Sequence, residues 1–217
     1  MAKKQVVVIG LGRFGSSLAR TLTERGYEVL GLDMDMKRVE EVAEYATQAA
    51  QVDATNEEAL REMGVRNFDV GVVAIGDDIK SSILVTLLLK RLGLRTVISK
   101  AQDDLHGEIL EKVGADRVVY PERETGVRVA HALTTPSLVD YLEVMPGYGI
   151  AKVMVPSSLE GKELGQLDLK GTFGITTLIL RRGNELIVNP SRSELLGRGD
   201  ILVLAGRDEK LEALKTS

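Results

Sequence analysis

The chain has 217 residues, of which 44% are apolar and 28% charged, and its 28 Lys and Arg against 32 Asp and Glu give a net charge of −4. This composition excludes a mainly disordered chain, because it supplies enough apolar surface for a buried core. The absence of cysteine excludes disulfides, thiolate metal sites and cysteine nucleophiles. Net negative charge and a 4% aromatic content argue against nucleic acid as a partner.

The chain has no apolar stretch that is long enough for a membrane-spanning helix. The longest uncharged one, residues 81–89, has about half of the length required. The amino terminus reads Met-Ala-Lys-Lys and runs directly into an apolar strand, without a small-residue cleavage site. We therefore expect a cytoplasmic protein with no direct membrane insertion.

Up to about residue 133, apolar runs of strand length alternate with segments of helical period, which predicts a parallel sheet covered by helices on both faces. The predicted strands are residues 6–9, 27–32, 48–52, 69–75, 96–99 and 117–119. The predicted helices are residues 13–25, 57–63, 79–92, 105–113 and 122–133. Together they predict an α/β fold, a Rossmann-like doubly wound parallel sheet of six strands.

The rhythm changes beyond Pro121, because residues 134–136 break the last helix and residues 145–149 are dense in turn formers. Apolar runs typical of strands then follow at residues 151–155, 175–180, 186–188 and 201–205, with a short helix from Arg207. This predicts a nucleotide-binding domain over residues 1–133, including a crossover helix, and a small α+β lobe over residues 134–217. Pairing with a second copy would stabilise so small a lobe.

A glycine-rich motif directly follows the first strand and opens the first helix. Glycines there permit a tight turn and a close approach of backbone amides to a phosphate, while the helix N-terminus supplies partial positive charge. Asp33 at the end of the second strand completes the fingerprint of a nucleotide- or dinucleotide-binding site. The predicted binding residues of the motif are Gly10, Gly12, Arg13, Phe14 and Gly15.

Asp33 is the predicted ribose anchor, since a carboxylate accepts hydrogen bonds from ribose hydroxyls and would repel a 2′-phosphate. This favours NAD(H) or an adenine nucleotide over NADP. Asp35 is a second candidate, with a helix N-cap or a solvated turn as the alternative. Arg13 lies inside the glycine loop, where its guanidinium could neutralise a third phosphate; a solvated surface arginine is the alternative.

Residues at the carboxyl ends of the later strands are further candidates for the cleft, because open α/β sheets bind their ligands there. Turns and helix caps explain each of them equally well. Glu122, after the sixth strand, is either a ligand for a divalent cation or a first-turn helix acid. The other candidates, in chain order, are Asp53, Ala54, Ala74, Ile75, Gly76 and Lys100, with Asp77 and Asp78 beside them.

The groups that turnover requires are missing from the sequence. The two histidines, His106 and His131, both fall on predicted helices, and no Ser/His/Asp set or metal-binding spacing is present. We therefore predict no catalytic residue, and a protein that senses a nucleotide rather than an enzyme. The alternatives are an NAD(P)-dependent oxidoreductase and a nucleotide-responsive transcription regulator, although the sequence has no basic helix-turn-helix segment.

The chain resembles the RCK family, the regulators of K⁺ conductance that serve Ktr and Trk potassium transporters. Its length of one unit is similar to the Ktr branch. The segments that carry the resemblance are VVVIGLGRFG at residues 6–15 with Asp33, NFDVGVVAIG at 67–76, Ser99 to Ala101, GADRVVYPERETG at 114–126, ELGQLDL at 163–169 and GDILVLAG at 199–206.

The resemblance implies homodimers that assemble into an octameric ring beneath a KtrB- or TrkH-like membrane K⁺ transporter subunit, at the inner face of the membrane. ATP and ADP, or NADH and NAD⁺, would favour different ring shapes. A γ-phosphate contact maps onto Arg13, and a divalent cation such as Mg²⁺ or Ca²⁺ at the dimer interface maps onto Glu122. A cyclic di-AMP pocket in the C-terminal lobe would include Leu164, Ile175 and Pro190.

Overall fold

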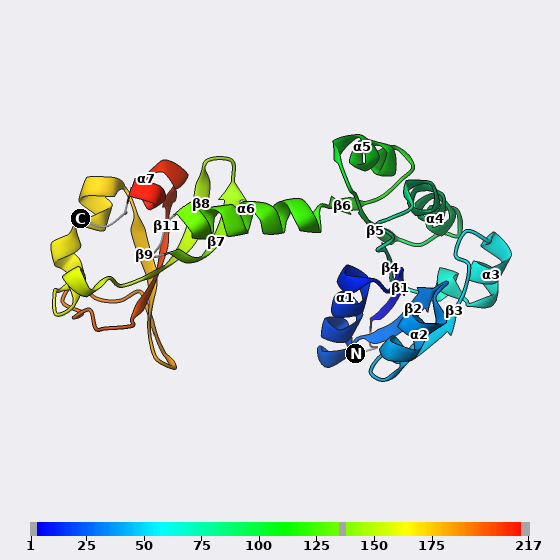
Figure 1. Ribbon diagram of the computed structural model, residues 1–217, viewed down its shortest axis with the longest axis horizontal. Coiled ribbons are helices and arrows are strands. Elements are labelled where there is room, and N and C mark those ends of the chain that lie inside the picture. Colours follow the sequence, from blue (N-terminus) through cyan, green and yellow to red (C-terminus); the bar gives the residue numbers. More distant parts are fainter. Residues whose placement is uncertain (1–3, 135–137, 214–217) are drawn as a thin grey trace. The chain divides into compact units, whose positions relative to one another are not determined.

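The computed structural model describes residues 4–134 and 138–213, and the chain divides into two compact units between Glu122 and Arg123 (Figure 1). The predicted boundary at residues 133/134 assigns the helix that begins at Pro121 to the first domain, whereas the compact units assign most of it to the second. The helix break predicted at residues 134–136 falls largely outside the described residues. Among the helices of the described ranges, none combines the length and the apolar character that a bilayer span needs.

The first unit contains a parallel sheet of six strands, which confirms the predicted fold class. Each strand of the sheet is short, and Val7 in the central strand pairs with Leu30 on one side and Gly71 on the other. The order across the sheet is β3-β2-β1-β4-β5-β6. The strands are β1 (Gln5–Ile9), β2 (Glu28–Asp33), β3 (Gln48–Gln51), β4 (Val70–Val73), β5 (Thr96–Lys100) and β6 (Arg117–Val119).

Helices cover both faces of this sheet, because successive side chains of a strand point to opposite faces. Val7 and Ile9 pack in one core with residues of the third and fourth helices, whereas Val6 and Val8 pack in another with residues of the first and second. The helices are α1 (Arg13–Glu24), α2 (Met36–Ala43), α3 (Glu57–Glu62), α4 (Ile79–Arg91) and α5 (Asp104–Lys112), followed by α6 (Pro121–Thr134).

The sequence pattern does not predict α2. It has eight residues, in which the buried Val39 and Val42 stand three apart at helical spacing, but the pattern covers only about two turns. Its start is fixed by Asp35, whose carboxylate accepts a hydrogen bond of 2.9 Å from the amide of Lys37. Asp35 therefore does serve as a helix N-cap, which was one of the two interpretations of this residue.

The second unit contains an antiparallel sheet of five strands in the order β10-β9-β11-β8-β7. The strand β7 is missing from the sequence prediction. Within it Tyr141 alone is buried, and its pairing with β8 shifts register twice, so that no clean alternation marks it. The strands are β7 (Leu138–Met145), β8 (Tyr148–Met154), β9 (Thr176–Arg182), β10 (Glu185–Val188) and β11 (Ile201–Arg207), followed by α7 (Asp208–Ala213).

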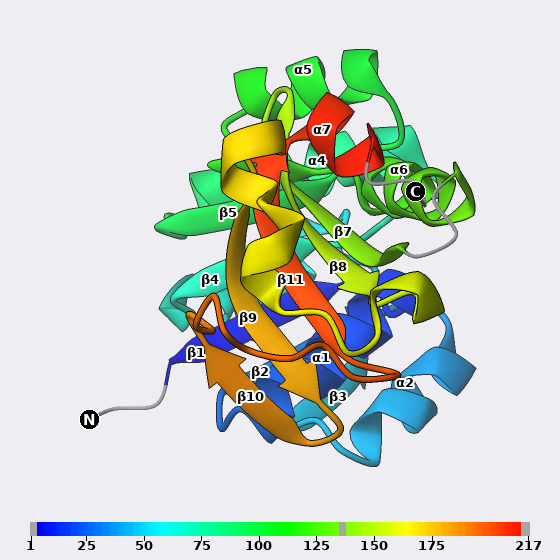
Figure 2. The same cartoon turned by 90° about the vertical axis from the view of Figure 1, so that its left-hand side faces the viewer.

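One face of the second sheet packs against short helical turns at Ser157–Leu159, Leu164–Leu167 and Leu169–Phe173, drawn in yellow in Figure 2. Leu180, Leu202 and Leu204 of the sheet share this core with Leu164 and Ile175. The interdigitated leucines explain why a unit of this size folds around one core.

An ion pair stabilises one end of this unit. The carboxylate of Asp200, whose side chain is 2% exposed, accepts from Nη2 of Arg182 at 2.8 Å and from the amide of Gly197 at 2.8 Å. Arg182 also contacts Glu194, with 3.2 Å between Nη1 and Oε1. Burial opposes ionisation of Asp200, but the hydrogen bonds from Arg182 and Gly197 outweigh it and hold the pKa of Asp200 below its ordinary value.

Helix α6 differs from the other long helices in that its side chains from Glu122 to Ala130 are all exposed. They include the apolar Val127 and Val129, and Gly126 lies between them and the start of the helix. An exposed helix of this length is marginal in water when nothing packs on it.

Candidate functional site

The glycine loop joins β1 to α1, and two of its glycines are required by packing. Gly10 has φ +92°, in the left-handed region, and a Cβ there would lie 2.9 Å from the carbonyl carbon of Ala74. A Cβ on Gly15 would overlap the carbonyl oxygen of Gly10. These glycines therefore let the first turn of α1 approach the ends of β1 and β4.

Gly12 has a different role, because a Cβ at this position would meet nothing within 4 Å. It is the N-cap of α1 and offers no side chain to accept from the helix's first amides, and no acidic residue lies in the first turn. The first turn thus presents backbone donors and partial positive charge to the open space in front of Gly12.

Asp33 at the end of β2 fixes the loop from the side. Its Oδ2 accepts a hydrogen bond of 2.6 Å from the amide of Leu11, and its Oδ1 accepts one of 2.8 Å from the amide of Asp35. The side chain is 9% exposed. The carboxylate predicted to hold a ribose therefore also holds the backbone that approaches the phosphates.

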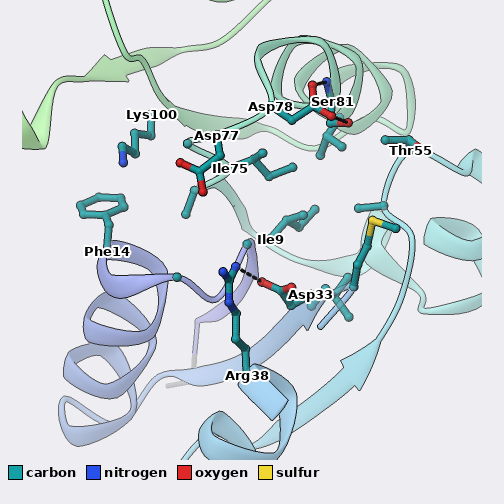
Figure 3. A pocket seen from close by; sticks show the side chains of 18 of the residues that line it. Ile9, Phe14, Asp33, Arg38, Thr55, Ile75, Asp77, Asp78, Ser81 and Lys100 are labelled. Atoms are coloured by element: carbon teal, nitrogen blue, oxygen red, sulfur yellow. Dashed lines mark hydrogen bonds and ion pairs between the residues drawn. The ribbon is translucent and has the colours of Figure 1, made fainter. Parts of the chain in front are cut away.

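Arg38 is a charged residue of this site that the sequence analysis missed. Its Nη1 lies 3.6 Å from Oδ2 of Asp33 (Figure 3). Its Nε lies 3.6 Å from Oδ2 of Asp35. The guanidinium reaches Asp33 because Asp35 starts α2, which puts residue 38 in the first helical turn. The sequence signal that could have indicated Arg38 is its position three residues after an aspartate that can act as an N-cap.

These elements enclose one cavity of about 560 Å³, within the range of small-molecule sites. Figure 3 shows Phe14 and Lys100 on one side of it and Thr55 on the other. Of the predicted binding residues, Gly15 and Asp35 do not line the cavity: Gly15 packs behind the loop and Asp35 caps α2. The predicted residues that do line it are Gly10, Gly12, Arg13, Phe14, Asp33, Asp53, Ala54, Ala74, Ile75, Gly76, Lys100 and Glu122.

Acidic side chains lie at the carboxyl end of β4. Asp78 caps α4 through hydrogen bonds from the hydroxyl and the amide of Ser81, at 2.7 and 3.1 Å, and these bonds lower its pKa. Asp77 lines the cavity beside it. Ser81 and Arg38 also line the cavity, and the sequence motifs predict neither of them.

Lys100 and Glu122 meet at the edge of the cavity, with 2.6 Å between Nζ and Oε1. The lysine holds the pKa of Glu122 below its usual value. Among the described residues, no group of three His, Cys, Asp or Glu could hold a metal ion. The divalent cation at Glu122 stays a prediction.

No histidine is found among the described residues that line the cavity. His106 is buried in α5, where its Nδ1 accepts from the amide of Gln102 at 3.3 Å, and burial lowers its pKa. In the second unit, Leu164 and Ile175 are core residues and Pro190 is half-buried after β10. The geometry therefore supplies a binding cavity in the first unit without a histidine for proton transfer.

Comparison with known proteins places both units in described families. The TrkA-N domain family matches residues 6–121, and the TrkA-C domain family matches residues 150–217. The GsuK RCK domain superposes with a TM-score of 0.69 at 19% identity, over 99% of this chain and 47% of that one. The NAD-bound GsuK channel superposes with a TM-score of 0.66 at 18% identity, over 100% of this chain and 40% of that one. This chain spans less than half of the length of either, and the likeness shows the fold.

Sequence relatives are more specific. The Ktr system potassium uptake protein C of Bacillus subtilis is 43% identical over 94% of this chain and 92% of its own length. The Ktr system potassium uptake protein A of Vibrio alginolyticus is 36% identical, over 96% of this chain and 94% of its own length. Such relatives confirm the prediction of a regulator rather than an enzyme. The chain therefore belongs to the RCK family of Ktr-type regulatory proteins, and its function lies in the regulation of K⁺ transport.

Proposed function

We propose that this chain senses an adenine nucleotide and gates a membrane K⁺ uptake transporter through a change in the shape of its assembly. The observation that carries the proposal is the open space in front of Gly12, faced by the first amides of α1 and flanked by Asp33. Backbone donors at a helix N-terminus are suited to a phosphate chain, and a carboxylate beside them is suited to a ribose.

ATP and ADP are the proposed ligands, with NADH and NAD⁺ as the alternative pair. GsuK structures, which share the fold, are described as bound to NAD and to ADP. Arg13 lies on the cavity wall in the first turn of α1, and that turn has no acidic residue. A guanidinium there would favour the ligand with the third phosphate, because ADP lacks that group.

The mechanism we propose is a population shift. A nucleotide changes the balance between two arrangements of the subunits only if it binds one of them more tightly, and such coupling free energies are typically about 1–3 kcal/mol. ATP would favour the conducting arrangement. The proposed assembly is a homodimer that builds a homo-octameric ring under a KtrB- or TrkH-like subunit, at the inner face of the membrane. The exposed apolar residues of α6, Val127 and Val129, support an interface between copies.

Two finer predictions stay tied to the family resemblance. A divalent cation at Glu122 would need a second copy of the chain, so no step of the mechanism passes through it. Cyclic di-AMP would have to reach Leu164 and Ile175, which are buried within the core of the second unit, beside Pro190.

Replacing Arg13 with alanine tests the proposed ligand preference. We expect ATP affinity to fall about tenfold, as for the loss of one charge-assisted contact, and ADP affinity to change less than about twofold. Isothermal titration calorimetry with ATP and ADP measures both. Arg25→Ala is the matched control, because Arg25 is an exposed arginine at the other end of the same helix.

An unchanged preference for ATP over ADP in Arg13→Ala would reject the role given to Arg13. Titrations of the wild-type chain with NADH and NAD⁺ decide between the two ligand pairs. The oxidoreductase alternative predicts oxidation of NADH by added acceptors, which absorbance at the nicotinamide band would detect.

A further inference from the structure

Lys100 touches both the cavity and the segment that leaves the first unit. It is the last residue of β5, and its ammonium lies so close to the segment after β4 that a Cβ on Gly76 would be 2.9 Å from Nζ. The same ammonium is 2.6 Å from Oε1 of Glu122, in the first turn of α6. One cation is therefore shared between the wall of the cavity and the start of that helix.

The two partners of this ion pair differ in their surroundings. The side chain of Lys100 is 12% exposed, whereas that of Glu122 is 69% exposed. An ammonium buried to this extent requires an anion, since leaving it unpaired is costly. The glutamate carboxylate can be hydrated where it stands, and the N-terminal end of a helix also favours its charge. The hydrogen bond between Lys100 and Glu122 can therefore break at a small cost in free energy, provided that another anion binds Lys100.

The charges that surround the cavity point to the same exchange. Arg38 also lines the cavity and is also ion-paired, but with two carboxylates, those of Asp33 and Asp35. Within the described part of the chain, Glu122 is the acid that is ion-paired with Lys100. A polyphosphate in the cavity would therefore compete with only one carboxylate for Lys100, and that carboxylate faces solvent.

We propose that the phosphate chain of the bound nucleotide and the carboxylate of Glu122 compete for Lys100, so that the longer phosphate chain releases the first turn of α6. This rests on the proposed function and makes Lys100 the positioning residue that reports occupancy of the cavity to α6. The exchange replaces one charge-assisted hydrogen bond with another, and the released carboxylate is taken up by water.

The exchange is tested by nucleotide titrations of the full-length chain in EDTA, which removes divalent cations. Glu122→Gln removes the competitor, so ATP affinity should rise about tenfold, the size expected for one charge-assisted hydrogen bond. Lys100→Met should lower ATP affinity. Adding Glu122→Gln to Lys100→Met should leave affinity unchanged, because no cation remains to compete for.

Lys90→Met is the matched control. Lys90 makes a similar ion pair with Asp116, with 2.9 Å between Nζ and Oδ2, but it does not line the cavity. Its nucleotide affinities should stay within about twofold of the wild type. A second readout is hydrogen exchange of the amides of residues 124–130, which ATP should accelerate in the wild type and not in Lys100→Met.

Two results overturn the exchange while leaving the proposed function intact. Wild type could bind ATP while Glu122→Gln fails to raise the affinity. Alternatively, Glu122→Gln could raise affinity equally with and without Lys100, which would show that Glu122 acts by direct repulsion of the ligand. Absence of any adenine nucleotide binding to the wild-type chain is a different result, since it rejects the proposed function and the exchange together.

Discussion

Replacing Gly15 with alanine is expected to destabilise the first unit by about 3 kcal/mol and to abolish nucleotide binding. The added methyl group would overlap the carbonyl oxygen of Gly10, which is backbone and cannot rotate away. The first turn of α1 would have to move off the ends of β1 and β4, and the donors in front of Gly12 would move with it. Urea unfolding, with hydrogen exchange of residues 4–122 to locate the loss, measures the effect.

Gly12→Ser is the matched control for this substitution. A Cβ at residue 12 meets no neighbour, and serine is a good N-cap, so stability should be unchanged or slightly higher. Binding should nevertheless be lost, because the hydroxyl accepts from the amides that the ligand needs. Equal destabilisation by the two substitutions would contradict the division of the loop into packing and ligand-facing glycines.

Arg182→Met is expected to destabilise the second unit by about 3 kcal/mol at pH 7, because it leaves the buried carboxylate of Asp200 without its cation. Arg182 itself is 41% exposed, so part of the charge is still screened by water. Arg181→Met is the control, since Arg181 is exposed on the neighbouring position of β9. Urea unfolding followed by circular dichroism, with hydrogen exchange of residues 138–213, measures both.

The penalty of Arg182→Met should depend on pH. The pKa of Asp200 is lower in the folded protein than in the unfolded chain, so the ion pair stabilises fully above the unfolded value, about 3.9, and its contribution is lost as pH falls through the folded value. The stabilities of wild type and variant should therefore begin to converge as the pH falls below about 4. A penalty that is the same at pH 7 and at pH 3 would mean that lost packing, rather than charge, causes it.

The six-stranded sheet could be predicted from the sequence because its buried strands are nearly continuous apolar runs. Residues 6–9 and 71–73 are buried on both faces, and short continuous apolar runs of this kind are typical of strands in a covered parallel sheet. The prediction failed where few side chains are buried. Strand β7 buries only Tyr141, so it shows no regular alternation, and α2 keeps its apolar spacing over only two turns, which is too short a pattern to stand out.

The residues of the cavity also divide into those that the sequence predicts and those that it does not. The glycine motif and Asp33 could be placed from spacing alone, because their roles depend on backbone geometry at the end of a predicted strand. Contacts that depend on side-chain reach could not be placed. Arg38 became visible only with α2, and the pairing of Lys100 with Glu122 joins residues that belong to different elements.

Helix α6 carries a consequence for how the protein reaches its final structure. Its exposed residues 122–130, with Gly126 among them, give it little reason to stay helical in a solitary chain. Burial between copies would supply the missing stabilisation, so helix formation in this segment and subunit association become a single equilibrium. In newly synthesised chains, residues 122–130 would then remain largely non-helical until the chain concentration is high enough for two copies to associate.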